Sequence, residues 1–146
     1  LIQPAEEYPM THPLTRSQLT QIAEQWVGLW NSPTDWALFD RLHADDFVDH
    51  ASAGREAHKA AFGQSIVDLQ AAFPDIQVQV DDVVIDEERQ HVAVRWSALG
   101  TNAQHYLGVG PTRRATRITG IEIIDMAHGR IVRRWGEWDI TDHLRG

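Results

Sequence analysis

The chain has 146 residues, of which 42% are hydrophobic and 23% are charged, a composition typical of one globular domain. Its net charge of -8 argues against binding to nucleic acid or to anionic membranes, and no apolar run is long enough to cross a bilayer. The absence of cysteine excludes disulfides, thiolate metal sites and a cysteine nucleophile, and together with the lack of a secretion signal it favours a cytoplasmic protein.

The first half of the chain predicts an extended arm followed by three helices. Residues 1–14 hold three prolines and show no apolar period, so we expect an arm ahead of a single domain over residues 15–146. Thr15 and Gln18 stand at the spacing of a capping box, and apolar residues then recur at helical intervals. A second, short helix follows, and a third lies between Gly54 and Pro74.

The second half alternates between apolar and polar residues and predicts strands. A short strand at residues 43–50 precedes the third helix, and four long strands follow it, mostly joined as hairpins. The segment 100–114 is glycine-rich and predicts a long loop or a distorted strand end. This segregated order predicts an α+β fold in which a curved antiparallel sheet wraps around the three helices in a cone-like shape, with a central pocket on its concave side.

Several ordered blocks of the chain resemble the SnoaL-like polyketide cyclase family. The first carries an Ala-Phe-Pro-Asp junction followed by an alternating strand. The blocks are residues 71–84, 92–101, 107–114, 120–124 and 129–139, and the likeness as a whole covers about residues 15–140.

This resemblance implies the cone-shaped fold shared with ketosteroid isomerase, limonene epoxide hydrolase and the nuclear transport factor superfamily. Founding members close the last ring of an aromatic polyketide by an aldol condensation without metal or cofactor, while relatives act as hydroxylases or bind ligands. It therefore implies a cofactor-independent enzyme acting by acid/base chemistry on a hydrophobic, polycyclic or polyketide-like carbonyl compound. It also implies a homodimer, for which an exposed sheet face carrying Trp135 is suited.

The chain departs from the family at the position where its cyclases carry an acid/base aspartate, which is Gly136 here. Glu137 is adjacent, but it faces the other side of a regular strand and replaces the aspartate only if a bulge redirects it. The glycine also removes one carboxylate from a carboxylate–arginine–carboxylate trio of the limonene epoxide hydrolase kind. An alternative is therefore a non-catalytic ligand-binding or dimeric assembly module that keeps the pocket.

Glu122 is the first candidate for the missing acid/base. Its same-face neighbours two residues away are Gly120 and Ile124, and we expect these surroundings to desolvate the carboxylate and raise its pKa. In the alternative interpretation Glu122 is a structural carboxylate that pairs with an arginine on a neighbouring strand, namely Arg95, Arg117 or Arg134.

Asp49 and His50 follow the short strand that we expect at the mouth of the pocket, where the family often supplies a polar contact to its ligand. His50 could relay a proton or bind a substrate oxygen. The alternative for both residues is a turn or capping pair at the surface.

Four further residues are candidates for substrate binding. Trp96 and Trp138 could stack on a flat ligand, although core packing also explains them. Because Trp135 and Trp138 are an odd number of residues apart, at most one of them faces the pocket of a regular strand. His105 and Tyr106 lie in the glycine-rich segment, where His105 could equally be an exposed loop residue. The eight histidines show no metal-ligand spacing, and we expect neither a metal nor a cofactor.

Overall fold

The computed structural model describes residues 12–146, so the predicted arm over residues 1–14 lies mostly outside the described residues. Its end is attached to the tip of a hairpin. The backbone N–H of Leu14 donates to Gln90 Oε1 at 2.8 Å, and Gln90 Nε2 donates to the Leu14 carbonyl at 2.9 Å.

The first predicted helix is α2 (Arg16–Gly28), which begins at the predicted capping box. The Thr15 hydroxyl accepts from the N–H of Gln18, and the Gln18 side chain accepts from the N–H of Thr15. These two bonds use backbone donors that would otherwise lack partners in the first turn. The sequence pattern therefore located the start of this helix correctly.

The other two predicted helices also form, and the third begins later in the chain than the pattern indicated. Helix α3 (Trp36–Leu42) is capped by Asp35, and helix α4 (Lys59–Ala72) is capped by His58, whose ring accepts from a backbone N–H. The third helix thus begins at residue 59, and a turn-rich loop separates Gly54 from it. A further short helix, α5 (Thr141–Leu144), was not predicted because four residues carry no readable period.

In the part of the chain that the structure describes, five strands form one sheet in the order β1-β5-β4-β3-β2. Neighbours among β2 to β5 are antiparallel, as predicted, whereas β1 pairs with β5 in parallel. A two-residue turn at His128 and Gly129 joins β4 to β5, and both residues have positive φ, 53° and 78°, as expected of a tight hairpin. The strands are β1 (His43–Asp49), β2 (Gln77–Asp86), β3 (His91–Thr101), β4 (Ala115–Ala127) and β5 (Arg130–Asp139).

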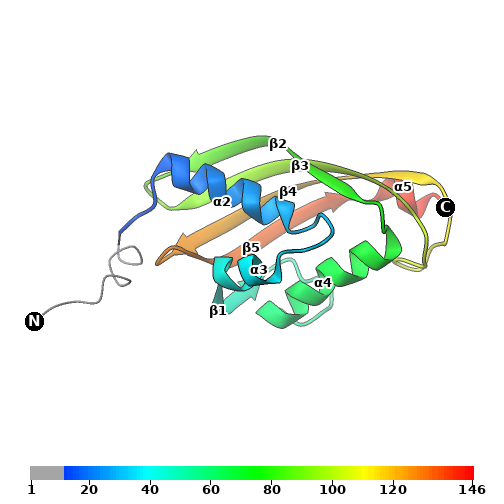
Figure 1. Ribbon diagram of the computed structural model, residues 1–146, viewed down its shortest axis with the longest axis horizontal. Coiled ribbons are helices and arrows are strands. Elements are labelled where there is room, and N and C mark those ends of the chain that lie inside the picture. The colour runs from blue at the N-terminus through cyan, green and yellow to red at the C-terminus, as the bar shows by residue number, and fades with distance from the viewer. Residues whose placement is uncertain (1–11) are drawn as a thin grey trace, which may run out of the picture.

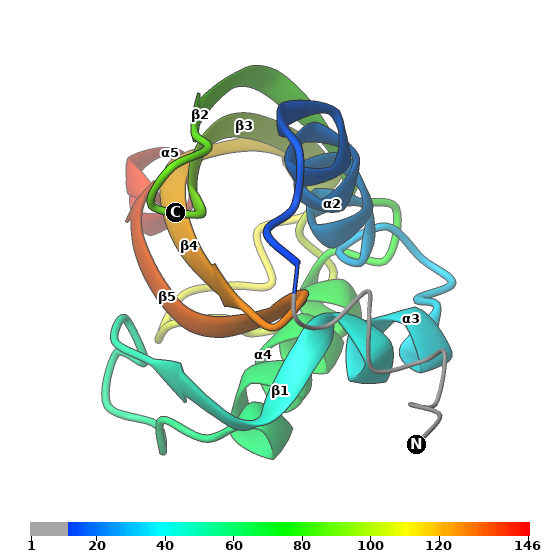
Figure 2. The same ribbon diagram turned by 90° about the vertical axis from the view of Figure 1, so that its left-hand side faces the viewer.

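The sheet is strongly curved, and helices occupy its concave side (Figures 1 and 2). Viewed end-on, β2 to β5 form an arc, and α2 lies at the open side of this arc (Figure 2). The predicted α+β fold with a curved sheet around helices is therefore confirmed. Large apolar side chains from α2, α4 and the concave strand faces form the core, among them Trp26, Phe62, Ile66, Phe73, Ile118 and Ile124.

The outer edge of β2 is partly covered by a side chain. Asn31 Nδ2 donates to the Val78 carbonyl at 3.0 Å, and Asn31 Oδ1 accepts from the Val78 N–H at 2.7 Å. These bonds use a backbone N–H and a carbonyl of the edge strand that could otherwise pair with a strand of another chain. No helix within residues 12–146 combines the length and the apolar character needed to cross a membrane.

Candidate functional site

Glu122 lies in the middle of β4, opposite Val94 on β3 and Gly136 on β5, and its side chain enters the concave interior of the sheet. Only 2% of the residue is exposed. The predicted desolvation is therefore present. It arises because the alternation along β4 places Glu122 on the same side as the buried residues Gly120 and Ile124.

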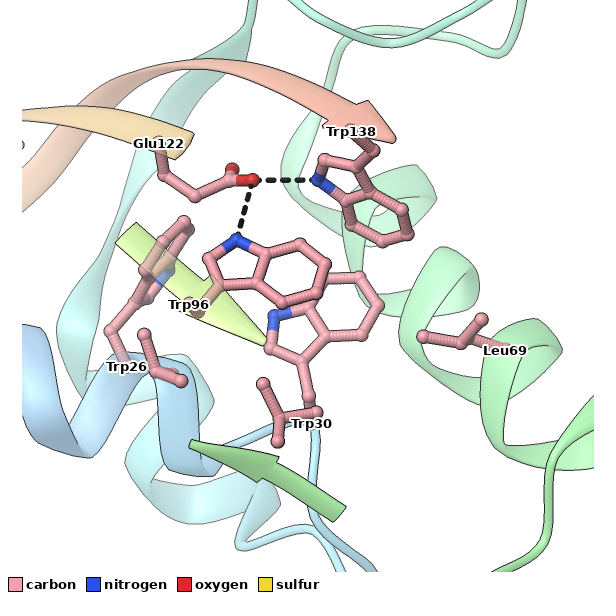
Figure 3. A pocket seen from close by; sticks show the side chains of 8 residues that line it. Trp26, Trp30, Leu69, Trp96, Glu122 and Trp138 are labelled. Atoms are coloured by element: carbon pink, nitrogen blue, oxygen red, sulfur yellow. Dashed lines mark hydrogen bonds between the residues drawn. The ribbon is translucent and has the colours of Figure 1, made fainter. Parts of the chain in front are cut away.

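Three donors surround the Glu122 carboxylate. Oε1 accepts from Arg134 Nε at 2.7 Å, and Oε2 accepts from Trp96 Nε1 at 3.1 Å and from Trp138 Nε1 at 2.6 Å. The two indole bonds are drawn in Figure 3. Burial raises the pKa of Glu122, while Arg134 and the two indoles act to lower it. Because all three partners donate and cannot accept, these contacts favour the carboxylate over the protonated acid.

Arg134 connects this carboxylate to a second one. Its Nη1 donates to Asp49 Oδ1 at 2.8 Å, and the other oxygen of Asp49 accepts from Arg55 Nη2 at 2.6 Å. The Arg134 guanidinium carbon also lies 5.1 Å from the centre of the Phe62 ring. Two carboxylates and two guanidinium groups therefore alternate along one chain of contacts, and their formal charges cancel.

A carboxylate–arginine–carboxylate trio thus exists, but with members other than those the family pattern suggested. Asp49 and Glu122 are its acids, and Arg134 is its centre. Sequence reasoning named Arg134 only as one of three partners for Glu122 and did not name Arg55. The sequence did contain a signal for the role of Arg134. Alternation along β5 places Arg134 on the same face as Trp138, and a buried arginine needs a partner of opposite charge.

Gly136 makes room for the ion pair between Arg134 and Glu122. A Cβ atom added at Gly136 would lie 2.5 Å from Glu122 Oε1 and 2.6 Å from Arg134 Nη2, closer than such atoms approach in proteins. An aspartate at this position is therefore incompatible with the observed pair. Glu137 is exposed and on the other face of β5, as alternation predicts, so it does not replace the aspartate.

Tryptophans fill the concave interior next to Glu122. The enclosed space that remains has a volume of about 10 Å³, roughly what one water molecule needs. The expected central pocket is therefore nearly closed in this conformation. Figure 3 shows the side chains that enclose this space, labelled Trp26, Trp30, Leu69, Trp96, Glu122 and Trp138.

An open cleft of about 360 Å³ adjoins this interior. Trp30 and Trp138 line both spaces, and their ring centres are 5.3 Å apart. Polar groups on the cleft wall come from the short loop after β1, from α4, from the 102–114 loop and from β5. They are contributed by Arg55, Ser65, Asp68, Tyr106, Arg134 and Glu137.

The structure brings together five of the seven predicted site residues. Glu122, Trp96 and Trp138 are in direct contact, Asp49 joins them through Arg134, and Tyr106 lines the adjoining cleft.

The two remaining candidates, His50 and His105, lie elsewhere. The His50 ring stacks on Trp135 at 4.7 Å with an interplanar angle of 8°, and both side chains are exposed on the convex side of the sheet. His105 is an exposed loop residue. As predicted, Trp135 and Trp138 face opposite sides of β5. Within residues 12–146, no three His, Cys, Asp or Glu side chains are grouped as a metal ion would require.

Solved structures of other proteins share this fold. No curated protein shows significant similarity to the chain. Among solved structures, IdmH of Streptomyces antibioticus, a proposed polyketide cyclase, is 27% identical with a TM-score of 0.75, covering 88% of this chain and 96% of its own. AclR of Streptomyces galilaeus, a proposed hydroxylase, is 21% identical with a TM-score of 0.78, covering 90% of this chain and 85% of its own.

TsrD of Streptomyces laurentii shares the fold at 19% identity, with a TM-score of 0.80 over 90% of this chain and 96% of its own. The family model for SnoaL-like polyketide cyclases matches residues 20–145, which is nearly the whole chain. On this match the chain belongs to the SnoaL-like polyketide cyclase family.

Proposed function

We propose that this protein is a cofactor-independent enzyme that applies acid/base chemistry to a hydrophobic, polycyclic or polyketide-like carbonyl compound. The observation that carries the proposal is the position of Glu122. Its buried carboxylate is paired with Arg134, and the rings of Trp30 and Trp138 line both the space beside this carboxylate and an open cleft. A carboxylate in apolar surroundings beside a substrate cleft is suited to proton transfer.

In the proposed reaction the substrate lies in the cleft against Trp30, Trp138 and Tyr106. Movement of Trp138 removes one of the two indole donors from Glu122 Oε2, which makes the carboxylate a stronger base and opens its path to the substrate.

Glu122 then takes a proton from the carbon next to the carbonyl, and the electron pair of that C–H bond forms an enolate. Attack of the enolate carbon on a second carbonyl closes a ring, and the resulting alkoxide takes the proton back from Glu122. Asp49 has a positioning role, since it holds Arg134 from the side opposite Glu122. His50 has no part in this scheme because its ring stacks on Trp135 on the convex side.

The test compares wild type with Glu122→Gln and with the control Glu88→Gln, which removes an exposed carboxylate in the turn between β2 and β3, away from the cleft. Melting temperatures are measured at pH 7 with polycyclic aromatic ketones, steroids and terpene epoxides, and turnover is followed for the class that binds. A ligand that binds the folded state raises the melting temperature. We expect stabilisation of all three proteins, with turnover lost only in Glu122→Gln. Turnover that survives in Glu122→Gln would exclude Glu122 as the proton carrier.

A second candidate function, a non-catalytic ligand-binding module, is favoured by a specific observation. All three donors around Glu122 are engaged with it, and the residue is nearly inaccessible, as expected of a structural carboxylate. In that case wild type shows no turnover, and Glu122→Gln only changes the shift in melting temperature that the ligand causes.

We also propose that the protein forms a homodimer through the convex face of the sheet. Ile121, Ile123 and Trp135 are exposed there by 54%, 42% and 40%, and a cluster of large apolar side chains in water favours association. Light scattering after gel filtration is expected to give twice the 16.6 kDa chain mass, and Trp135→Glu is expected to give the single mass. A monomeric wild type at micromolar concentration would contradict this proposal.

A further inference from the structure

One nitrogen of the buried Arg134 guanidinium is not used by the network. Nε donates to Glu122, and Nη1 donates to Asp49 at 2.8 Å and to the Ala51 carbonyl at 3.4 Å. No hydrogen bond among the described residues involves Nη2. The buried side-chain nitrogens and oxygens without partners in this part of the chain are Arg55 Nε, Asp125 Oδ1 and His143 Nδ1. Since Nη2 is not one of them, it is an unpaired donor that reaches accessible space.

Arg134 and Gly136 both line the cleft, and a Cβ atom added at Gly136 would lie 2.6 Å from Nη2. We therefore assign the accessible space at Nη2 to the cleft. The missing side chain at position 136 thus leaves an opening through which Nη2 faces the cleft. Residues on three sides hold the guanidinium in place, namely Asp49, Phe62 and Glu122. A donor held this rigidly is organised for an acceptor before any ligand arrives.

The charges around Nη2 indicate which kind of acceptor it suits. Arg134 and Arg55 are already balanced by Glu122 and Asp49. The cleft wall also carries Asp68 and Glu137, both exposed. A carboxylate ligand would add negative charge to a site with no positive charge to spare, whereas an uncharged carbonyl oxygen accepts a hydrogen bond without that cost.

We infer that Arg134 is a ligand-binding residue of the cleft, whose Nη2 donates to an uncharged carbonyl oxygen, with Gly136 as the opening that admits it. This inference rests on the proposed function and names the group that orients its substrate. Glu122 Oε1 and Arg134 Nη2 both lie next to the same point over Gly136, so they are within a few ångströms of each other. One ligand can therefore place its carbonyl oxygen on Nη2 and the neighbouring C–H bond near Glu122.

The test uses three probes with the same tricyclic skeleton: 9-fluorenone, fluorene, which lacks the oxygen, and fluorene-9-carboxylate. Dissociation constants are measured by quenching of tryptophan fluorescence, because Trp30 and Trp138 line the cleft, and are checked by calorimetry. Wild type is expected to bind fluorenone at least about tenfold more tightly than either other probe, the effect of one hydrogen bond from a charged donor.

Two variants remove the donor in different ways. Arg134→Lys keeps the charge but loses the planar fork that spans Glu122 and Asp49. Gly136→Ala keeps all charges, but its Cβ atom would lie 2.6 Å from Nη2, so it displaces the guanidinium and fills the opening. Both are expected to lose the preference for fluorenone while still binding fluorene. The control, Arg95→Lys, lies on the convex face with 54% of its side chain exposed and is expected to keep the preference.

Each outcome decides the question. A wild type that binds fluorenone and fluorene equally, or a preference that survives in both variants when they are folded, overturns the role of Arg134 and leaves the proposed function in place. Tighter binding of the carboxylate overturns the argument from charge. A wild type that binds none of the three probes overturns the proposed function together with this inference.

Discussion

Replacement of Arg134 by methionine is expected to lower the free energy of unfolding by about 3–5 kcal/mol, the range found when one partner of a buried ion pair is removed. Methionine keeps much of the arginine volume, so the loss reports on the charges and not on a cavity. Both Glu122 and Asp49 would be left without the group that now lies between them, and Arg134 itself is only 3% exposed.

Urea denaturation of wild type, Arg134→Met and the control Arg95→Met measures this effect. Arg95 faces solvent and its nearest carboxylate oxygen, on Asp81, is 3.7 Å away, so its replacement is expected to cost less than about 1 kcal/mol. Adding Glu122→Gln to Arg134→Met is expected to restore part of the stability, because it removes one unpaired buried charge. No restoration, or a loss as small as that of Arg95→Met, would show that the network contributes little to folding.

Acidification from pH 6.5 to pH 4 is expected to destabilise the protein by about 3 kcal/mol through His43 alone. His43 is fully buried among Phe39, Phe47 and Phe62, and its burial lowers the pKa from 6.5 to about 4. Lys59 contributes to this lowering, while a hydrogen bond to the Phe39 carbonyl and the charge of Asp40 act to raise the pKa.

The hydrogen bonds of His43 explain why its neutral form is the native one. Nδ1 lies 2.7 Å from the Phe39 carbonyl oxygen, and Nε2 accepts from Trp26 Nε1 at 3.0 Å. Protonation of Nε2 would place a hydrogen against the indole donor. Between pH 6.5 and pH 4 the unfolded chain therefore binds a proton at this residue that the folded chain does not, so stability falls as the pH falls.

The measurement is the free energy of unfolding of wild type and His43→Gln between pH 4 and pH 7.5. The difference between the two curves isolates His43, because other groups titrate alike in both proteins. Among them is Glu122, whose raised pKa acts in the opposite sense and stabilises the fold toward low pH. The control His105→Gln removes a histidine from an exposed loop, and its curve is expected to run parallel to that of wild type. Parallel curves for wild type and His43→Gln would contradict the prediction.

Local sequence patterns determined the secondary structure and the faces of the strands. The capping box at Thr15 located the first helix, and the alternation along β5 assigned Trp138 to the interior and Trp135 to the exterior. The same alternation predicted that Glu122 is desolvated and that Glu137 cannot replace an aspartate at position 136. These features depend on residues that are close in the chain, so periodicity alone identifies them.

Only the tertiary structure decided which groups meet. Arg134 and Asp49 are 85 residues apart in the sequence. Their contact depends on the parallel pairing of β1 with β5, which local sequence patterns do not predict. The role of Gly136 depends on the position of the Glu122 side chain, because a Cβ atom at residue 136 would lie 2.5 Å from Glu122 Oε1. The closed interior likewise follows from the packing of Trp96 and Trp138 against each other. A two-residue period states which face a side chain occupies, but which partner it contacts depends on strand register and side-chain packing across the whole fold.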